Sequence, residues 1–314
     1  MIDFLSHLGY SKNFFKVESF DGHGLPKIVE VSFDGSKSKE RILKVFKGSI
    51  NSKEEMMAVL QQLPDYDGLY SIVNIEMDLE WILSCANKLI SFVYIGRIKN
   101  IDYISKFTKL RYLSLKGCKQ PLDLSKLNQL IEISVEQVDF LGFKFSPLAN
   151  IRHFRFVNCR NISSIPINKN TPLQYLSVLW DRDTKSFDFL KEAANLEIIG
   201  LFRVSQLEHW PDSSQMTRLR RIYFADTNRF FDFSGLAKAP NLECINFGIN
   251  GIKPVHLEPF LACKSLKYLR YSGTKKDNAL VREMFPGVLM DDDDQPEDCS
   301  GTSVRFSEDD WVMR

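Results

Sequence analysis

The cysteine, histidine and aspartate residues are the first candidates for chemistry, because their spacing would reveal a metal site or a nucleophile. None of the six cysteines stands in a CxxC pair, and none of the five histidines in an HExxH motif. Zinc fingers, thioredoxin-like sites and zinc peptidases are therefore not indicated. The four acids at 291–294 are consecutive and lack the alternating ligands of a calcium loop. We predict no metal site, no cofactor and no catalytic residue.

Glycine-rich phosphate loops and nucleophile elbows are missing as well. Gly22 and Gly24 lie in DGHGLP without a third glycine three residues later, so a hairpin turn explains this segment better than a nucleotide site. No GxxxxGK[ST] and no GxSxG occurs. An enzyme with a site at the junction between an N-terminal module and the rest of the chain stays open as the least favoured alternative, and no motif argues for it.

A repeat in the middle of the chain forms the scaffold that positions any functional side chains. Nine segments fit the template L-x-x-L-x-L and start at residues 89, 110, 130, 151, 173, 196, 219, 242 and 266. All 27 template positions are apolar or aromatic, and the starts lie 20 to 24 residues apart. Each unit predicts a short strand, a turn, and a helical or irregular return.

This pattern resembles the leucine-rich-repeat family, whose unit reads L-x-x-L-x-L-x-x-N/C-x-L. The resemblance covers about residues 89–290, and its repeats are irregular. In the family, the ninth residue hydrogen-bonds the backbone of the turn; here that column reads Arg97, Cys118, Val138, Cys159, Asp181, Val204, Thr227, Asn250 and Thr274. The resemblance implies an α/β solenoid with a parallel sheet on its concave face and helical or irregular convex returns.

The chain divides into three parts. Residues 1–68 predict a small α+β module that caps the solenoid: KIVEVSF alternates like a strand, and Ser52 with Glu55 forms a capping-box pattern ahead of an apolar helix face. Residues 69–290 predict the solenoid, with a degenerate first unit near Leu69 and a short last strand in FPGVLM. Residues 291–314 form an acidic C-terminal tail.

The net charge of +1 hides an asymmetry between the body and the tail. The tail holds nine acids against Arg305 and Arg314, a net of −7, and residues 1–290 hold 39 basic and 31 acidic side chains, a net of +8. Charge imbalance of this kind concerns partners, not the fold. The tail is either a solvated segment or one that touches the basic body or a basic partner.

The positions between the template residues should face the concave surface, because side chains alternate along a strand. They combine aromatic and apolar side chains with arginines, the composition of protein-interface hot spots. Carboxylates such as Glu132 and Glu136 interrupt the positive field, so nucleic acid is unlikely as a partner. The alternative is that some of the rings pack on the sheet or on the tail. Our predicted partner-binding residues are Tyr112, Arg155, Tyr175, Leu179, Trp180, Phe202, Arg203, Arg221, Tyr223 and Arg270.

These features predict a non-enzymatic protein that recognises another protein on its concave face. Our first hypothesis is a bacterial immunity protein that neutralises a polymorphic toxin, and the alternative is an adaptor or substrate receptor whose N-terminal module binds a second protein. The start lacks a basic region followed by a long apolar core, and no 18-residue apolar stretch occurs. We therefore expect a cytoplasmic location and no membrane partner, and we predict no particular oligomeric state.

Overall fold

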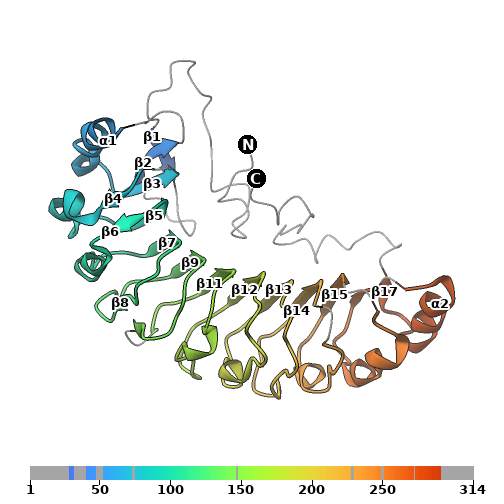
Figure 1. Ribbon diagram of the computed structural model, residues 1–314. Helices are drawn as coiled ribbons and strands as arrows, with labels where there is room; N and C mark the ends of the chain where they lie inside the picture. The colour runs from blue at the N-terminus through green and yellow to red at the C-terminus, as the bar shows by residue number, and fades with distance from the viewer. Residues whose placement is uncertain are drawn as a thin grey trace.

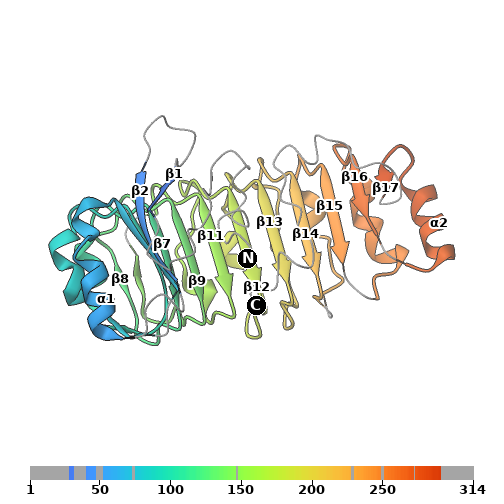
Figure 2. The same ribbon diagram turned by 90° about the horizontal axis from the view of Figure 1, so that it is seen from above.

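Thirteen strands form one curved sheet that lines the inside of an arc (Figure 1). The computed structural model describes residues 28–31, 40–46, 52–72, 75–145, 148–227, 230–248, 251–271 and 273–290. The sheet order is β1-β2-β3-β5-β7-β9-β11-β12-β13-β14-β15-β16-β17. Strand β1 pairs antiparallel with β2, and every later pair is parallel, so the strands lie side by side in chain order (Figure 2).

The main strands are mostly five residues long. Their bounds are β1 Ile28–Val31, β2 Glu40–Phe46, β3 Gly68–Ile72, β5 Ser91–Ile95, β7 Tyr112–Lys116, β9 Glu132–Glu136, β11 His153–Val157, β12 Tyr175–Leu179, β13 Ile198–Phe202, β14 Arg221–Ala225, β15 Cys244–Gly248, β16 Tyr268–Arg270 and β17 Leu289–Met290. Two small parallel sheets join neighbouring returns: β4 Met77–Asp78 with β6 Ile98–Lys99, and β8 Asp123–Leu124 with β10 Lys144–Phe145.

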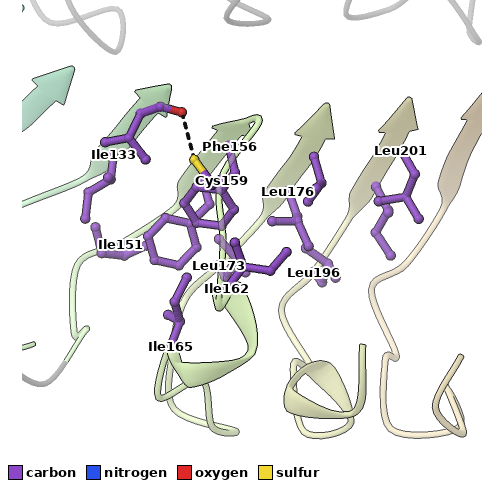
Figure 3. Packing of buried hydrophobic residues seen from close by; sticks show 14 of the residues in the cluster. Ile133, Ile151, Phe156, Cys159, Ile162, Ile165, Leu173, Leu176, Leu196 and Leu201 are labelled. Atoms are coloured by element: carbon purple, nitrogen blue, oxygen red, sulfur yellow. Dashed lines mark hydrogen bonds between the residues drawn. The ribbon is translucent and has the colours of Figure 1, made fainter. Parts of the chain in front are cut away.

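The core lies between the sheet and the returns. All 27 template positions are buried, and all belong to one continuous apolar cluster. Figure 3 shows how residues such as Phe156, Leu176 and Leu201 point from the strands towards the returns. The predicted leucine-rich-repeat solenoid is confirmed, because each repeat buries its apolar residues only by stacking on its neighbours.

The returns are mainly 3₁₀ helices on the outer side of the arc. They cover Leu63–Asp65, Leu79–Cys85, Ile101–Lys106, Ile162–Ser164, Asp188–Leu190, Leu236–Lys238 and Pro254–Ala262. Among the described residues, only α1 (Lys53–Leu60) and α2 (Lys275–Met284) are α-helices. A unit of 20 to 24 residues leaves little chain for a return, and the 3₁₀ helix gains more length per residue than the α-helix. Pro259 also interrupts α-helical hydrogen bonding in the longest return.

The ninth-residue column is irregular, as predicted, and its polar members act in different ways. The Cys159 thiol contacts the Val135 and Val157 carbonyl oxygens at 3.4 and 3.5 Å, and the Asp181 carboxylate accepts from the Thr184 backbone N–H at 2.7 Å. The Thr227 hydroxyl has no hydrogen-bond partner although it is buried. Thr227 therefore does not make the backbone hydrogen bond that the resemblance implies for this column.

The N-terminal part continues the same sheet and the same core. Ser52 caps α1 by accepting the Glu55 backbone N–H at 3.1 Å, as the capping pattern predicts. Met56 and Leu60 on α1 and Leu43 on β2 belong to the main core cluster. The sheet therefore runs across residues 68 and 69, where we predicted a boundary, and the separate capping module and the domain limits stay predictions.

Both ends of the predicted solenoid contain the expected short strands. The degenerate first unit forms β3 with Leu69 buried, and the last strand is β17. The ninth-column residue Asn250 and the acidic tail 291–314 lie outside the described residues.

Candidate functional site

The concave face of the sheet consists of three rows of side chains, because register aligns the positions between the core residues across neighbouring strands. The first row passes through Tyr112, Glu132, His153, Tyr175, Ile198, Arg221, Cys244 and Tyr268. The second row passes through Ser114, Ser134, Arg155, Ser177, Gly200, Tyr223, Asn246 and Arg270. The third row passes through Lys116, Glu136, Val157, Leu179, Phe202, Ala225 and Gly248.

The predicted partner-binding residues all lie in these rows or directly after them. Tyr112, Tyr175 and Arg221 stand in the first row, Arg155, Tyr223 and Arg270 in the second, and Leu179 and Phe202 in the third; Trp180 and Arg203 follow the strands. Their exposure differs. Tyr112, Arg155, Tyr175 and Leu179 are buried, Trp180, Phe202, Arg221 and Tyr223 are half-buried, and Arg203 and Arg270 are exposed.

Four apolar residues of the third row and its continuation form a cluster separate from the main core, which we call the concave cluster: Val157, Leu179, Trp180 and Phe202. The Trp180 and Phe202 rings are tilted with their centroids 6.4 Å apart. The Arg203 guanidinium lies over the Phe202 ring, 5.1 Å from its centroid, a cation–π distance. The structure thus brings together four of the predicted partner-binding residues, Leu179, Trp180, Phe202 and Arg203.

The residue after each central strand adopts the left-handed αL conformation, and these residues form what we call the αL ladder. Its members, with φ between 50° and 70°, are Gly117, Gln137, Asn158, Trp180, Arg203 and Asp226. Each backbone N–H donates to the carbonyl oxygen of the last residue of the next strand, for example from Trp180 to Phe202 at 2.7 Å and from Arg203 to Ala225 at 2.9 Å. The ladder therefore closes the sheet's hydrogen bonding at this edge.

Gln137, Trp180 and Arg203 are costly members of the αL ladder, and two of them, Trp180 and Arg203, are predicted partner-binding residues. Glycine adopts αL without strain and asparagine with little, whereas other residues pay about 1–2 kcal/mol. The Trp180 indole Nε1 is buried without a hydrogen-bond partner, and the Arg203 guanidinium Nε bonds the Asp226 carboxylate at 3.1 Å. Non-glycine residues held in αL are concentrated at functional sites, where the strain is tolerated for another purpose.

Charged groups are frequent in the N-terminal part of the rows, on β7 to β11. The Lys116 ammonium lies 2.6 Å from the Glu136 carboxylate, and His153 Nδ1 lies 3.6 Å from Glu132. Burial lowers the pKa of the Arg155 guanidinium, while Tyr175, Glu136 and Glu132 nearby raise it. Arginine stays charged even when its pKa is lowered, so this part of the face combines both signs of charge.

Tyr175 lies beside that charged group and is neutral at physiological pH. Burial raises the pKa of its hydroxyl to about 12. The His153 ring meets it edge to face, with centroids 6.2 Å apart. The phenol can therefore donate a hydrogen bond but cannot act as a base at neutral pH.

Sequence reasoning missed the Lys116–Glu136 pair and the αL ladder. The ladder residue is the eighth of each repeat, between the template and the ninth column, and we gave this position no structural role. Gly117 and Asn158, which occupy it in two of the repeats, are the sequence signal for it. Cys244 stands between template positions, on the concave side of its strand, and is nevertheless buried. It stands in register between Arg221 and Tyr268, and a short side chain between two long ones retains little accessible surface.

The reactive side chains of the described residues serve local structure. Burial raises the pKa of the Cys118 thiol, and raises that of Cys159 to about 12, which suppresses the thiolate. Hydrogen bonds from Ser125 lower the pKa of Asp123, and the Lys238 ammonium lowers that of Asp212 to about 2. Within the described ranges, no three His, Cys, Asp or Glu side chains gather as metal ligands would.

The described part of the chain has no helix of the length and apolar character needed to cross a membrane. The longest α-helix there, α2, has ten residues, and charged side chains are spaced along it.

Protein-family models and curated protein sequences contain no match to this chain. Among solved structures, an internalin (InlF) from Listeria monocytogenes is similar at 16% identity, with a TM-score of 0.51 and 79% of each chain covered. A leucine-rich-repeat protein from Leptospira interrogans has 12% identity and a TM-score of 0.28, covering 80% of this chain and 89% of its own. The functional domain of InlJ from Listeria monocytogenes has 13% identity and a TM-score of 0.22, covering 74% of each chain. The first likeness shows that the leucine-rich-repeat fold is shared.

Proposed function

We propose that this protein is a non-enzymatic recognition protein that holds a partner protein on its concave face. The observation that carries the proposal is the presence of Trp180 and Arg203 in the αL ladder. Gly117 and Asn158 fill the same position in two other repeats, so the backbone does not require a tryptophan or an arginine there. Retaining both side chains at a cost of about 1–2 kcal/mol each favours a role beyond the fold.

The chemistry of the concave cluster supports a protein partner. Trp180, Phe202 and Tyr223 offer broad ring surfaces, and Arg203 and Arg221 stand beside them. Tryptophan, tyrosine and arginine are the residues most enriched in interface hot spots, which form where an apolar centre is ringed by polar groups. Curved solenoids offer such surfaces over many strands, and here the rows extend from β7 to β16.

In its finer form, the proposal is an immunity protein that binds a bacterial toxin and covers its active site. This role requires tight binding and no chemistry of its own. The acidic tail, with a net charge of −7, suits a toxin that handles nucleic acid or nucleotides through a basic cleft, because opposite potentials steer association.

The first test is an affinity capture from native lysate that compares wild type with Trp180→Ala/Phe202→Ala/Arg203→Ala. The matched control is Leu141→Ala/Arg160→Ala/Lys185→Ala, which removes one large apolar and two basic exposed side chains outside the rows. Both variants should first melt within a few degrees of wild type. We expect the first variant to lose a partner that the control retains.

A partner retained by both variants would contradict the use of the concave cluster and would favour the adaptor alternative. That alternative should be tested in the full chain, because Leu43, Met56 and Leu60 share the main core and residues 1–68 would lose that core if expressed alone. Substitution of exposed α1 residues, such as Glu54→Lys, then tests the N-terminal surface.

The immunity role has its own test, which is rescue of growth. Cells that express the toxin-like neighbouring gene should survive when the wild-type protein is co-expressed, and should die with the triple concave variant. Survival independent of this protein, or no toxicity of the neighbour, would count against the immunity role while leaving a protein-binding function intact.

A further inference from the structure

We propose that the acidic segment 291–314 of this chain docks on the C-terminal half of the concave face, across β13 to β16. This inference goes beyond the proposed function, since it concerns an occupant that the chain itself supplies. It rests on the charges of the described rows, on where the described chain ends, and on the length and charge of the segment that follows.

The rows on β13 to β16 are basic. Arg221 and Arg270 stand in the first and second rows, and Arg203 stands in the αL ladder. Asp226 is the single acid that the structure describes in these rows and in the ladder beside them, and it bonds Arg203 at 3.1 Å. By contrast, Glu132 and Glu136 lie in the same rows on β9. The positive charge is therefore concentrated in one half of the face.

The segment that follows β17 has the complementary composition. Residues 291–314 carry nine acids and two arginines, a net of −7, and include the aromatic residues Phe306 and Trp311. Acidic groups matched to Arg221 and Arg270, and rings matched to Tyr223 and Phe202, would pair charge with charge and apolar with apolar surface.

The geometry of the sheet places this segment within reach. β17 is in register with β16, Leu289 beside Tyr268, so the chain leaves the sheet next to the strand that carries Arg270. Neighbouring strands are about 4.8 Å apart, which puts β14 and Arg221 roughly 14 Å from β17. An extended segment gains up to about 3.3 Å per residue, so fewer than ten residues cover that distance.

Tethering makes even weak docking effective. A short flexible link gives the second contact an effective concentration in the millimolar range, so a contact with a Kd of about 0.1 mM between separate molecules would be mostly formed within one chain. Docking of the segment would compete with a partner for the same rows. Because the attraction is between charges at the surface, it should weaken as salt is added.

The test is carbodiimide crosslinking, which joins a carboxylate to a nearby lysine amine, in the full chain carrying Arg221→Lys. This substitution keeps the charge and introduces a reactive amine. Arg221 is the informative site, because a lysine at 270 is next to β17 and could be reached by tethering alone. The matched control is Arg218→Lys, whose parent guanidinium lies 3.4 Å from the Glu197 carboxylate in the turn before β14.

We expect mass spectrometry to find the lysine at 221 joined to acids between 291 and 310 of the same molecule, with a yield that does not change on dilution. The yield should be lost at about 0.5 M NaCl, where the Debye length is about 4 Å. In the control, the lysine at 218 should join Glu197 and not the segment.

Two results would overturn the proposal. One is the absence of crosslinks between the lysine at 221 and the segment, under conditions in which the lysine at 218 of the control variant does join Glu197. The other is crosslinks that form only between two molecules and disappear on dilution. As a second measurement, Arg270→Glu in the Arg221→Lys chain should reduce the crosslink at 221 severalfold, whereas Arg218→Glu should leave it unchanged. Neither readout requires the partner of the proposed function.

Discussion

The two faces of the same strands follow different rules. On the core face, all 27 template positions are buried, are apolar or aromatic, and belong to one continuous cluster. On the concave face, the second row alone changes from Ser134 to Arg155 to Ser177 to Gly200 to Tyr223. Stacking requires the first face to be uniform. Stacking places no such requirement on the concave face, so the residues of that face can differ between repeats and can match a partner.

Two tryptophans illustrate the difference between the faces. Trp210 is 2% exposed, stacks on Phe187 with centroids 5.2 Å apart, and donates its Nε1–H to Ser213 at 2.9 Å. Trp180 is half-buried, adopts φ 55° and has no partner for its Nε1. Trp210 is packed and its Nε1–H is hydrogen-bonded. Trp180 has an unfavourable positive φ and a buried Nε1 without a hydrogen-bond partner.

The largest expected effect distinguishes these two residues. Trp210→Ala should lower the free energy of unfolding by about 3–5 kcal/mol, because it empties a packed site and leaves Ser213 without its donor. Trp180→Ala should lower it by only about 1 kcal/mol, as is typical of partly exposed side chains. Urea denaturation of the full chain measures both. Equal losses would contradict the distinction between the two faces.

The next effect tests a core-side position where a buried polar group lacks a hydrogen-bond partner. Thr227→Val removes a buried hydroxyl without a partner, and Val138 and Val204 occupy the same column. The free energy of unfolding should rise by about 1–2 kcal/mol, since an unsatisfied buried hydroxyl is costly. Thr184→Val is the control and should destabilise, because the Thr184 hydroxyl donates to the Asp181 carboxylate at 2.7 Å. A loss of stability in Thr227→Val would show that the hydroxyl is satisfied in solution.

A smaller effect measures the strain in the αL ladder. Arg203→Gly should be about 1 kcal/mol more stable than Arg203→Ala, because only glycine accepts a positive φ without a steric penalty. At Arg221, which begins β14 and is paired with both neighbouring strands, the order should reverse by about 0.5–1 kcal/mol, because glycine loses more backbone entropy than alanine when it is ordered in a strand. Thermal unfolding of the four variants gives both differences. If alanine is the better residue at both positions, Arg203 is not strained.

The smallest effect lies in a convex turn and belongs to neither face. The Lys238 ammonium, 2.8 Å from the Asp212 carboxylate, holds the pKa of that carboxyl at about 2, below its ordinary 3.8. A lowered pKa stabilises the fold above the ordinary value, and this contribution is lost as the pH falls from about 4 to 2. The stability advantage of wild type over Asp212→Asn should therefore shrink across that range. Parallel pH profiles would contradict it.

The core face could be predicted from the sequence, whereas the burial and backbone conformation of the concave residues could not. The template positions could be predicted because a repeat can stack on its neighbours only if residues such as Leu113 and Ile199 are apolar and face the core. The returns could be predicted only as helical or irregular, since short 3₁₀ turns have little sequence signal. The concave residues could be placed in rows, but the burial of Leu179 and Cys244 depends on their neighbours in register, and the φ of Trp180 depends on a hydrogen bond to the next repeat.

The reversal of β1 against β2 has a consequence for assembly. Among the described strands, β1 forms the N-terminal edge of the sheet and runs opposite to all the others. A solenoid whose two ends matched could add a second copy head to tail, and such open, heterologous contacts build filaments. Here a copy arriving with its β17 would meet a strand of the wrong polarity, and the parallel repeat could not continue. The reversed strand β1 thus prevents the parallel sheet of one solenoid from being extended by a second copy at this edge.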